Sequence, residues 1–163
     1  MAKHTLNSIG VELDFLLIGL MSQENMYSLA SIINDTLELE LELVDNIPFN
    51  LREGKLFYFS LFNYYKEEFE LQFFFIPNTS NLDQVNEFEI NKKQEDLFGD
   101  LNVEESTRLI KELPKTDYFL IVKGEDLHFY QFKILEKLKT KNGILQVQMI
   151  EQKELPSRMN LVF

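Results

Sequence analysis

The chain has 163 residues, of which 45% are apolar, and its 16 basic and 27 acidic side chains give a net charge of −11. This length and composition are typical of a folded domain and argue against a disordered chain. The negative charge repels phosphate groups, which disfavours direct binding to nucleic acid or to an anionic membrane.

The absence of cysteine excludes disulfides, thiolate metal sites and a thiol nucleophile. The first ten residues, MAKHTLNSIG, do not resemble a secretory signal, and the longest apolar run near them, Phe15 to Met21, has seven residues. A membrane-spanning helix needs about 20 apolar residues. We therefore expect a cytoplasmic protein that makes no membrane contact.

The N-terminal part predicts a buried strand over Val11 to Met21, because apolar residues run continuously between polar ones. Ser22 follows as a candidate helix cap. Apolar residues then recur at helical spacing, which predicts an amphipathic helix through about Asp35.

Residues 37–43 alternate strictly between leucine and glutamate, which predicts a strand with leucines on one face. The other face then carries Glu38, Glu40 and Glu42 about 7 Å apart, since strand residues rise about 3.3 Å each. Such neighbours cannot converge on a metal ion, whose oxygen ligands lie at about 2.0–2.6 Å. We interpret these glutamates as a solvated face and as a candidate surface for a protein partner.

A loop is expected at Asn46, Pro48 and Asn50 to Gly54. Two aromatic runs follow, Lys55 to Tyr64 and Phe69 to Ile76, and predict an antiparallel hairpin. Their rings are assigned to the core rather than to base stacking, because residues 1–80 hold 4 basic against 12 acidic side chains and a base-stacking platform requires basic neighbours.

The second half begins with a polar insertion at about residues 77–100. A helix is predicted over Val103 to Leu113, where Pro114 stops it. A strand is predicted over Asp117 to Val122.

Asp126 is the expected cap of a last helix with an apolar face formed by Leu127, Tyr130, Ile134, Leu135 and Leu138. Asn142-Gly143 closes it, and Ile144 to Ile150 forms a final strand. The C-terminal tail, residues 152–163, is apolar enough to dock either on its own domain or on a partner.

Residues 110–118, IKELPKTDY, resemble the signature of the bacterial IPExxxVDY family of Bacteroidetes-type bacteria. Four of its six defined positions match: Ile110, Glu112, Asp117 and Tyr118. Lys111 replaces the signature proline and Thr116 its valine. The resemblance implies kinship with a family of no established activity, so it identifies no reaction.

The two motif carboxylates, Glu112 and Asp117, have two interpretations. They either act together as a general acid and base in a shared pocket, or they cap backbone amides and pair with lysines. The second is the commoner use of such residues. Tyr118 starts an apolar strand and is expected to be a core ring with a hydrogen-bonded hydroxyl.

No established catalytic or cofactor pattern is present. His4 and His128 do not have metal-ligand spacing, no serine lies in a Gly-x-Ser-x-Gly turn, and the six glycines form no phosphate-binding loop. We therefore predict no metal and no cofactor.

The element order predicts an α+β protein, a two-layer sandwich in which helices cover one face of a mostly antiparallel sheet. A ferredoxin-like core is the preferred version, since strand–helix–strand units open and close the chain. We expect one domain over residues 1–151, followed by the tail.

Three functional hypotheses remain. The first is a non-enzymatic protein-interaction adaptor or regulator that uses an exposed face or the tail. The alternative is a small-molecule-binding or enzymatic domain, whose pocket would bring Glu112, Asp117, Tyr118 and His128 together. The third, mimicry of a nucleic acid by the acidic surface, has the least support.

Overall fold

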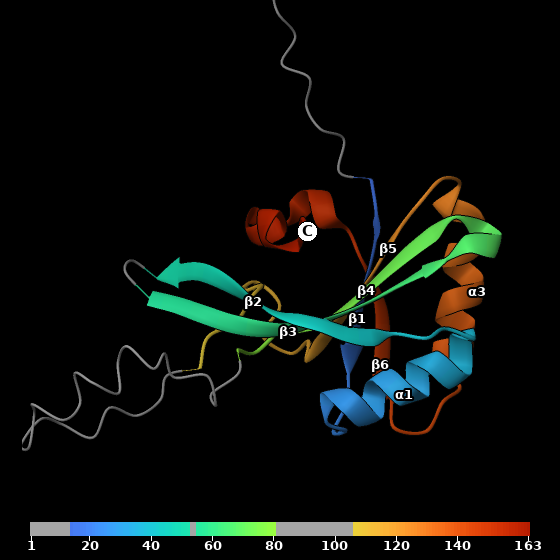
Figure 1. The fold of residues 1–163 in the computed structure, drawn as a ribbon, viewed down its shortest axis with the longest axis horizontal. Coiled ribbons are helices and arrows are strands. Elements are labelled where there is room, and N and C mark those ends of the chain that lie inside the picture. The colour runs from blue at the N-terminus through green and yellow to red at the C-terminus, as the bar shows by residue number, and fades with distance from the viewer. Residues whose placement is uncertain (1–13, 53–54, 81–105) are drawn as a thin grey trace, which may run out of the picture.

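The computed structural model describes residues 14–52, 55–80 and 106–163 (Figure 1). Its strands are β1 (Leu16–Met21), β2 (Glu42–Arg52), β3 (Lys55–Lys66), β4 (Leu71–Pro77), β5 (Tyr118–Lys123) and β6 (Gln146–Ile150). Its α-helices are α1 (Met26–Leu37) and α3 (Leu127–Lys139). Three 3-10 turns are also present: η1 (Glu67–Phe69) between β3 and β4, and η2 (Gln152–Glu154) and η3 (Pro156–Leu161) after β6. Neither of the two α-helices in this described part is long and apolar enough to cross a membrane.

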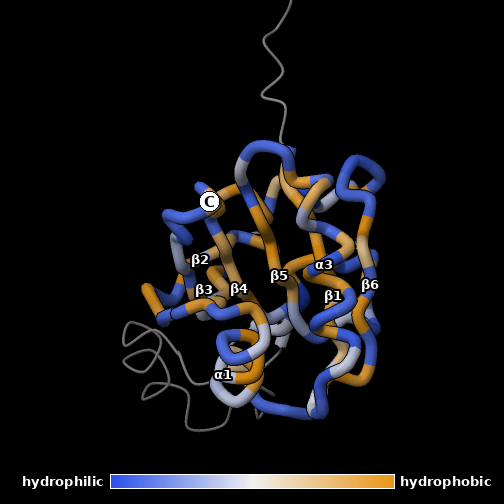
Figure 2. Tube along the Cα trace, turned by 90° about the vertical axis from the view of Figure 1, so that its right-hand side faces the viewer, coloured by the Kyte–Doolittle hydropathy of each residue, from blue (hydrophilic) through white to orange (hydrophobic). Residues whose placement is uncertain are grey.

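The strands form one sheet in the order β2-β3-β4-β5-β1-β6, and every neighbouring pair is antiparallel. Figure 2 shows apolar segments concentrated in the middle of this sheet, with β6 along one margin. The four strands β4-β5-β1-β6, with α1 and α3, have the ferredoxin-like order of two split strand–helix–strand units. The hairpin of β2 and β3 widens that core beyond β4, so the predicted α+β class and core are confirmed.

Side chains alternate between the two faces of the sheet, and both faces are buried. In β5, Leu120 and Val122 join the cluster beneath α1 and α3, whereas Phe119 and Ile121 join the opposite cluster. Figure 1 shows both helices on one side and the C-terminal turns on the other. The helices therefore cover one face, as predicted, and the C-terminal turns together with Leu109 and Ile110 cover the second.

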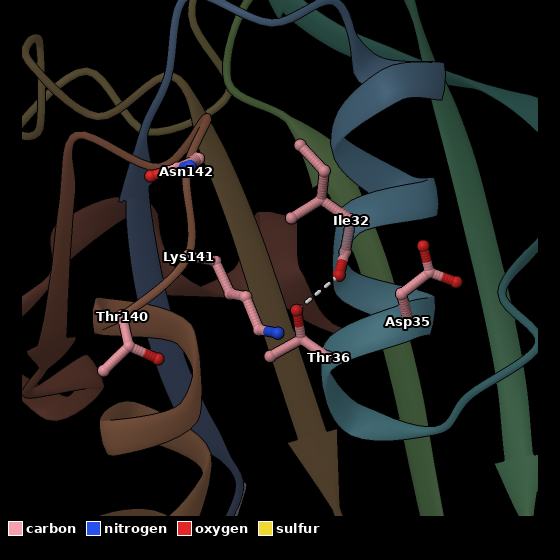
Figure 3. Close-up of a pocket in the computed structure, with 6 residues that line it drawn as sticks. All are labelled: Ile32, Asp35, Thr36, Thr140, Lys141 and Asn142. Atoms are coloured by element: carbon pink, nitrogen blue, oxygen red, sulfur yellow. Dashed lines mark hydrogen bonds between the residues drawn. The ribbon is translucent and has the colours of Figure 1, made fainter.

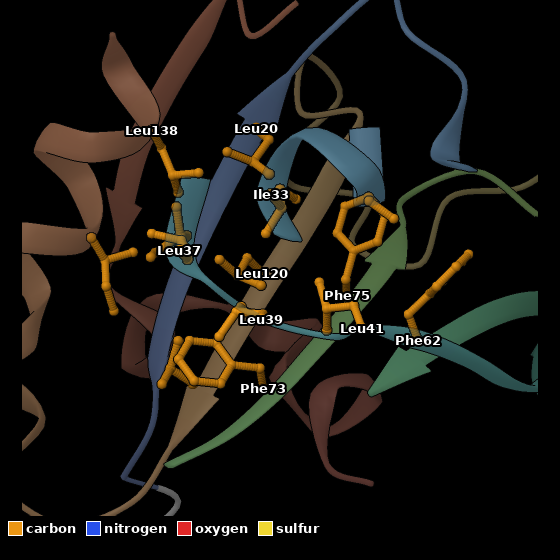
Figure 4. Packing of buried hydrophobic residues seen from close by; sticks show 14 of the residues in the cluster. Leu20, Ile33, Leu37, Leu39, Leu41, Phe62, Phe73, Phe75, Leu120 and Leu138 are labelled. Atoms are coloured by element: carbon orange, nitrogen blue, oxygen red, sulfur yellow. The ribbon is translucent and has the colours of Figure 1, made fainter. Parts of the chain in front are cut away.

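The core beneath the helices is rich in leucine and phenylalanine (Figure 4). Helix α1 contributes Leu29, Ile33 and Leu37, which recur every fourth residue and lie on one face. The sheet contributes Phe73 and Phe75 from β4. The prediction that the hairpin rings are core residues is confirmed for these two rings.

The caps of the helices differ partly from the prediction. Helix α1 begins after Asn25, whose side-chain Oδ1 accepts the N–H groups of Tyr27 and Ser28 at 3.0 and 2.9 Å. Ser22 is not its cap, because the Ser22 hydroxyl accepts the N–H of Glu24 before the helix starts. Asp126 is at the predicted cap position of α3, but its side chain makes no capping hydrogen bond.

The C-terminal tail docks on its own domain. Leu155 and Leu161 are buried against the sheet face opposite the helices. The Gln152 amide donates to the carbonyl of Phe15 at 2.9 Å, and Lys123 Nζ donates to the main-chain oxygen of Phe163 at 3.3 Å. Of the two alternatives for the tail, the structure selects packing within the chain.

The predicted strand over residues 37–43 is wrong in its first five positions. Leu37 is the last residue of α1, Glu38 is a left-handed cap with φ of 56°, and β2 begins only at Glu42. The Asn34 side chain holds the connection, since its Oδ1 accepts the Leu41 N–H at 2.8 Å and its amide donates to the Leu41 carbonyl at 3.3 Å. An extended connection produces the same alternation of burial as a strand.

The alternation itself is confirmed at six of the seven positions. The leucines at 37, 39 and 41 are buried, and Glu38, Glu40 and Glu42 are exposed. Leu43 departs from the pattern, because it lies on the edge strand β2 and is 42% exposed.

The loop predicted at residues 46–54 is also wrong over its described part, since β2 extends to Arg52. Pro48 lacks an N–H, yet it pairs with Tyr58 of β3. An edge strand tolerates this because every second N–H points away from the sheet and needs no partner strand. Residues 53–54 lie outside the described residues.

The helix predicted over residues 103–113 is absent from its described part, 106–113, which forms a β-bridge residue, bends and turns. Hydrogen bonds with Asn78 hold backbone groups of Leu109, Ile110 and Leu113 in place of the hydrogen bonds of a helix. Most of the insertion predicted at 77–100 lies outside the described residues, as do positions 103–105. The described part of the predicted insertion, residues 77–80, is not a polar surface loop. Pro77 ends β4, and Asn78 and Ser80 are buried.

Candidate functional site

The residues of the motif lie in a turn that is organised around the buried side chain of Asn78. The Asn78 Oδ1 accepts the N–H of Ile110 at 2.8 Å, and its amide donates to the carbonyls of Leu113 and Thr116 at 3.0 and 2.9 Å. The Asn78 main-chain N–H donates to the Asp117 carbonyl at 2.8 Å. One asparagine thus ties the end of β4 to the start of β5.

Two motif residues have structural partners on the face of the sheet opposite the helices. Ile110 is completely buried and belongs to the cluster of that face. Glu112 is exposed, and its Oε1 accepts the hydroxyl of Ser157 in the C-terminal tail at 3.0 Å. Glu112 therefore contacts the tail, and not the lysines that the sequence offered as partners.

The other two motif residues, Asp117 and Tyr118, face the start of α1. The Asp117 carboxylate accepts the N–H of Ser22 at 3.0 Å, which matches the expectation of a carboxylate that binds a backbone amide. The Tyr118 hydroxyl donates to the carbonyl of Glu24 at 2.8 Å, and its ring stacks on Phe75 with centroids 5.4 Å apart. Burial, and secondarily the charge of Asp117, raise the pKa of Tyr118 above its usual value.

Asp117 and Tyr118 line a shallow depression of about 430 Å³ beside the first turn of α1. Its remaining wall comes from residues 22–26 together with Pro77 and Thr79. The two motif side chains in it are already hydrogen-bonded to backbone groups. Of the two motif carboxylates only Asp117 lines the depression, so Glu112 and Asp117 do not form a general acid–base pair there.

His128 does not reach this depression. It is exposed in the first turn of α3, which follows the C-terminal end of β5, whereas Tyr118 begins that strand. A six-residue strand is about 20 Å long. The four side chains that a catalytic pocket requires are thus divided among the depression, the tail and the far end of β5.

A second shallow depression, of about 400 Å³, lies between α1 and the turn after α3 (Figure 3). Its polar groups come from Asp35, Thr36, Thr140, Lys141 and Asn142. The Thr36 hydroxyl donates to the Ile32 carbonyl at 2.6 Å, and Asp35 points away from Lys141. These side chains do not converge on a common point, and no group of three or more potential metal ligands occurs in the described ranges.

The acidic surface predicted at Glu38, Glu40 and Glu42 is exposed but is not a uniform acidic ladder. The Glu38 carboxylate lies 3.8 Å from Lys137 of α3, and Lys66 Nζ donates to the Glu38 carbonyl at 3.1 Å. Two lysines thus reduce the negative potential at one end of the row.

The outer face of α3 carries two exposed phenylalanines, which we call the phenylalanine pair: Phe129 and Phe132, 71% and 70% exposed. They lie one turn apart on the same side of the helix. The sequence contained the signal, since both fall outside the apolar face predicted for this helix. A phenylalanine outside the buried face of an amphipathic helix is exposed to solvent, a consequence that the sequence-based prediction did not include.

Comparison with protein-family models, curated proteins and solved structures finds no match. The resemblance of residues 110–118 to the IPExxxVDY signature therefore stays a prediction.

Proposed function

We propose that this chain is a non-enzymatic, cytoplasmic protein-interaction module that docks a protein partner on the outer face of α3. The phenylalanine pair is the observation on which the proposal depends. Phenylalanine is among the most often buried residue types, and elsewhere in the described part of this chain only Phe69 is also exposed, at 38%. Two adjacent rings in water are typical of a contact site.

The energetics favour a partner that covers these rings. Complete burial of a phenylalanine side chain contributes roughly 1.5–3 kcal/mol, so two adjacent rings supply a substantial part of a binding free energy. Large aromatic side chains, phenylalanine included, are enriched at protein interfaces and contribute much of the binding free energy there. The rings lie on a rigid helix whose buried residues Leu127, Ile134 and Leu138 anchor it to the core, so little ordering is required on binding.

The acidic row extends this surface. Glu38 lies beside α3, as its contact with Lys137 shows, and Glu40 and Glu42 continue from it along the chain. A partner that presents apolar side chains next to basic ones fits both features. The rim charges affect the association rate and its salt dependence more than the affinity.

Affinity capture from a lysate of the encoding organism tests the proposal. The unmodified chain is expected to retain a stoichiometric protein, and the double variant F129S/F132S to lose it. Neutralisation of the acidic row by E38Q/E40Q/E42Q is expected to weaken retention, with a smaller effect at high salt because salt already screens those charges.

The matched control is V44S/L56S, which removes one exposed apolar side chain from edge strand β2 and one from β3 beside it, far from α3 in the strand order. It should retain the partner. Equal retention by F129S/F132S and the unmodified chain would contradict docking on α3, provided that circular dichroism shows both proteins to be folded.

A further inference from the structure

The two margins of the sheet differ in how they are protected against pairing with another strand. The β2 margin contains Glu42, Asp45, Pro48 and Arg52, and its pairing with β3 has two register shifts. Charged residues, proline and irregular register are the features by which proteins prevent edge-to-edge association. The β2 margin is thus a guarded edge.

The β6 margin has none of these protections. Its sequence, Gln-Val-Gln-Met-Ile, contains no charge and no proline, and it pairs with β1 in continuous register. Among residues 14–52, 55–80 and 106–163, no strand pairs with its outer side. Met149 in the strand and Leu145 just before it are 37% and 65% exposed. Alternate N–H and C=O groups of β6 point outward with apolar side chains beside them.

Helix α3 extends this margin into the layer above the sheet. Val147 of β6 belongs to the same buried cluster as Ile134 and Leu138, so α3 packs over β6. The helix begins next to exposed acidic residues, Glu125 and Asp126, and ends next to exposed basic ones, Lys139 and Lys141. Its two ends therefore carry opposite charge.

We propose that β6 pairs antiparallel with β6 of a second copy of this chain. Antiparallel pairing about a two-fold axis perpendicular to the sheet makes one continuous twelve-stranded sheet from two six-stranded ones. Both α3 helices then lie on the same face and run in opposite directions. The acidic start of each helix faces the basic end of the other, and this charge complementarity is why a second copy fits the edge.

This dimer goes beyond the proposed function, because its interface is the open β6 edge of the sheet and not the phenylalanine pair on α3. The dimer also brings the phenylalanine pairs of both copies to one face of the joined sheet. A partner with two docking segments would then bind both copies at once.

The first test is the mass of the full chain in solution, measured by sedimentation over a concentration series. We expect twice the 19.3 kDa of one chain at the higher concentrations. The variant M149K places a lysine on the open edge and should shift the protein to monomer, whereas V44K on the guarded edge should leave the dimer unchanged. A wild-type chain that stays monomeric at every concentration, or an M149K dimer, overturns the proposal.

A charge-reversal pair tests the orientation of the helices. K139E should weaken the dimer, and the combination E125K/K139E should restore it, since opposite charges then face each other again. Failure of the combination to restore the dimer would overturn the antiparallel arrangement of α3.

A measurement on the unmodified chain removes any dependence on how the variants fold. Amide hydrogen exchange of the outward N–H groups of β6 should slow as the protein concentration rises, while exchange of β2 stays constant. Concentration-independent exchange in β6 overturns the pairing. Partner capture by the phenylalanine pair is measured in a separate experiment. A chain that stays monomeric but still retains a partner would therefore overturn the β6 dimer and leave docking on α3 unaffected.

Discussion

At the scale of single residues, the motif segment is explained by hydrogen bonding to Asn78. Its side chain is wholly buried and serves backbone groups of Ile110, Leu113 and Thr116, which have no helix or sheet partner of their own. Buried backbone groups must be satisfied, so this one side chain determines the path of the turn. Asp117 has a similar role toward Ser22. The backbone of the motif segment is therefore held by hydrogen bonds to Asn78, and Asp117 in turn holds Ser22.

Asn78→Ala is expected to lower the free energy of unfolding by about 3 kcal/mol, because each buried backbone group left without a partner costs roughly 1–3 kcal/mol. Chemical denaturation measures this loss. Asn78→Asp is the matched variant, since it keeps the oxygen that accepts the Ile110 N–H but replaces the amide donor with a carboxylate oxygen that faces the carbonyls of Leu113 and Thr116. It should lose stability as well, but by a different amount at low pH, where the carboxyl is protonated and can donate. Wild-type stability of Asn78→Ala would show that the turn does not depend on this residue.

Tyr118 gives a prediction about alkaline pH. Its pKa is raised in the folded chain, so the folded state holds the phenolic proton more tightly than the unfolded state. The stabilisation is complete below the unfolded pKa of about 10 and declines as pH rises through the folded value. Stability of Tyr118→Phe relative to wild type should therefore increase above about pH 10.

The check is denaturation at a series of alkaline pH values for both proteins. Lys123, whose pKa is lowered by burial, contributes a pH dependence of opposite sign in both, so the difference between the two proteins isolates Tyr118. A difference that does not change with pH would contradict the raised pKa of Tyr118.

At the scale of elements, the C-terminal tail acts as the second layer over the face that the helices leave open. Leu161 is completely buried there, and the carbonyl of Leu109 accepts the Asn160 amide at 2.9 Å. The tail and the motif turn therefore support each other. An antiparallel sheet with one apolar face uncovered would expose Phe119 and Ile121 of β5, so the tail is required for the fold rather than available to a partner.

Leu161→Ala is expected to destabilise the protein by about 3 kcal/mol, the usual cost of removing a buried leucine side chain and leaving a cavity. Met159→Ala, two residues earlier in the same turn, removes a side chain that is 63% exposed and should change stability by less than about 0.5 kcal/mol. Thermal and chemical unfolding of the two variants compare them directly. Similar stabilities for both variants would mean that the tail does not pack as described.

At the scale of the whole molecule, charge and apolar surface are distributed unevenly. Residues 81–105 hold eight acidic and two basic side chains, so that segment accounts for −6 of the net charge of −11. The rest of the chain is closer to neutral, which weakens an interpretation based on acidity alone. The exposed apolar side chains on α3 and near β6 are therefore the stronger guide to partners, and both proposed interfaces lie on that side of the sheet.

Much of the fold was predictable because its signals are local. The aromatic hairpin, the last helix with its apolar face, and the strands at residues 118–123 and 146–150 follow from periodicity within one element. The secondary-structure predictions failed where side chains from distant positions form hydrogen bonds with the backbone and replace the local hydrogen bonds of a helix or strand. The Asn34 side chain binds the backbone of Leu41 in an extended connection that has the burial pattern of a strand. The Asn78 side chain binds the backbone of Ile110, and residues 106–113 form turns and bends where a helix was predicted.

The candidate site was less predictable, since convergence of side chains is a property of the tertiary structure. Sequence proximity placed Glu112 and Asp117 together, yet one contacts Ser157 in the tail and the other Ser22 before α1. The exposure of Phe129 and Phe132 was in principle readable from the helical period. The contrast between the guarded β2 edge and the open β6 edge could not be predicted from the sequence, because the strand order that places β2 and β6 at the margins is a property of the tertiary structure.

By itself, the sequence determined the α+β class, the phenylalanine-rich core and the absence of disulfides, because composition and periodicity control which residues can be buried in each element. Only the tertiary structure decided that the tail is a layer of the fold, that the motif carboxylates serve backbone amides and hydroxyls, and that β6 is the open edge. These properties depend on which distant segments become neighbours, and that is settled by burying both faces of one sheet at the same time.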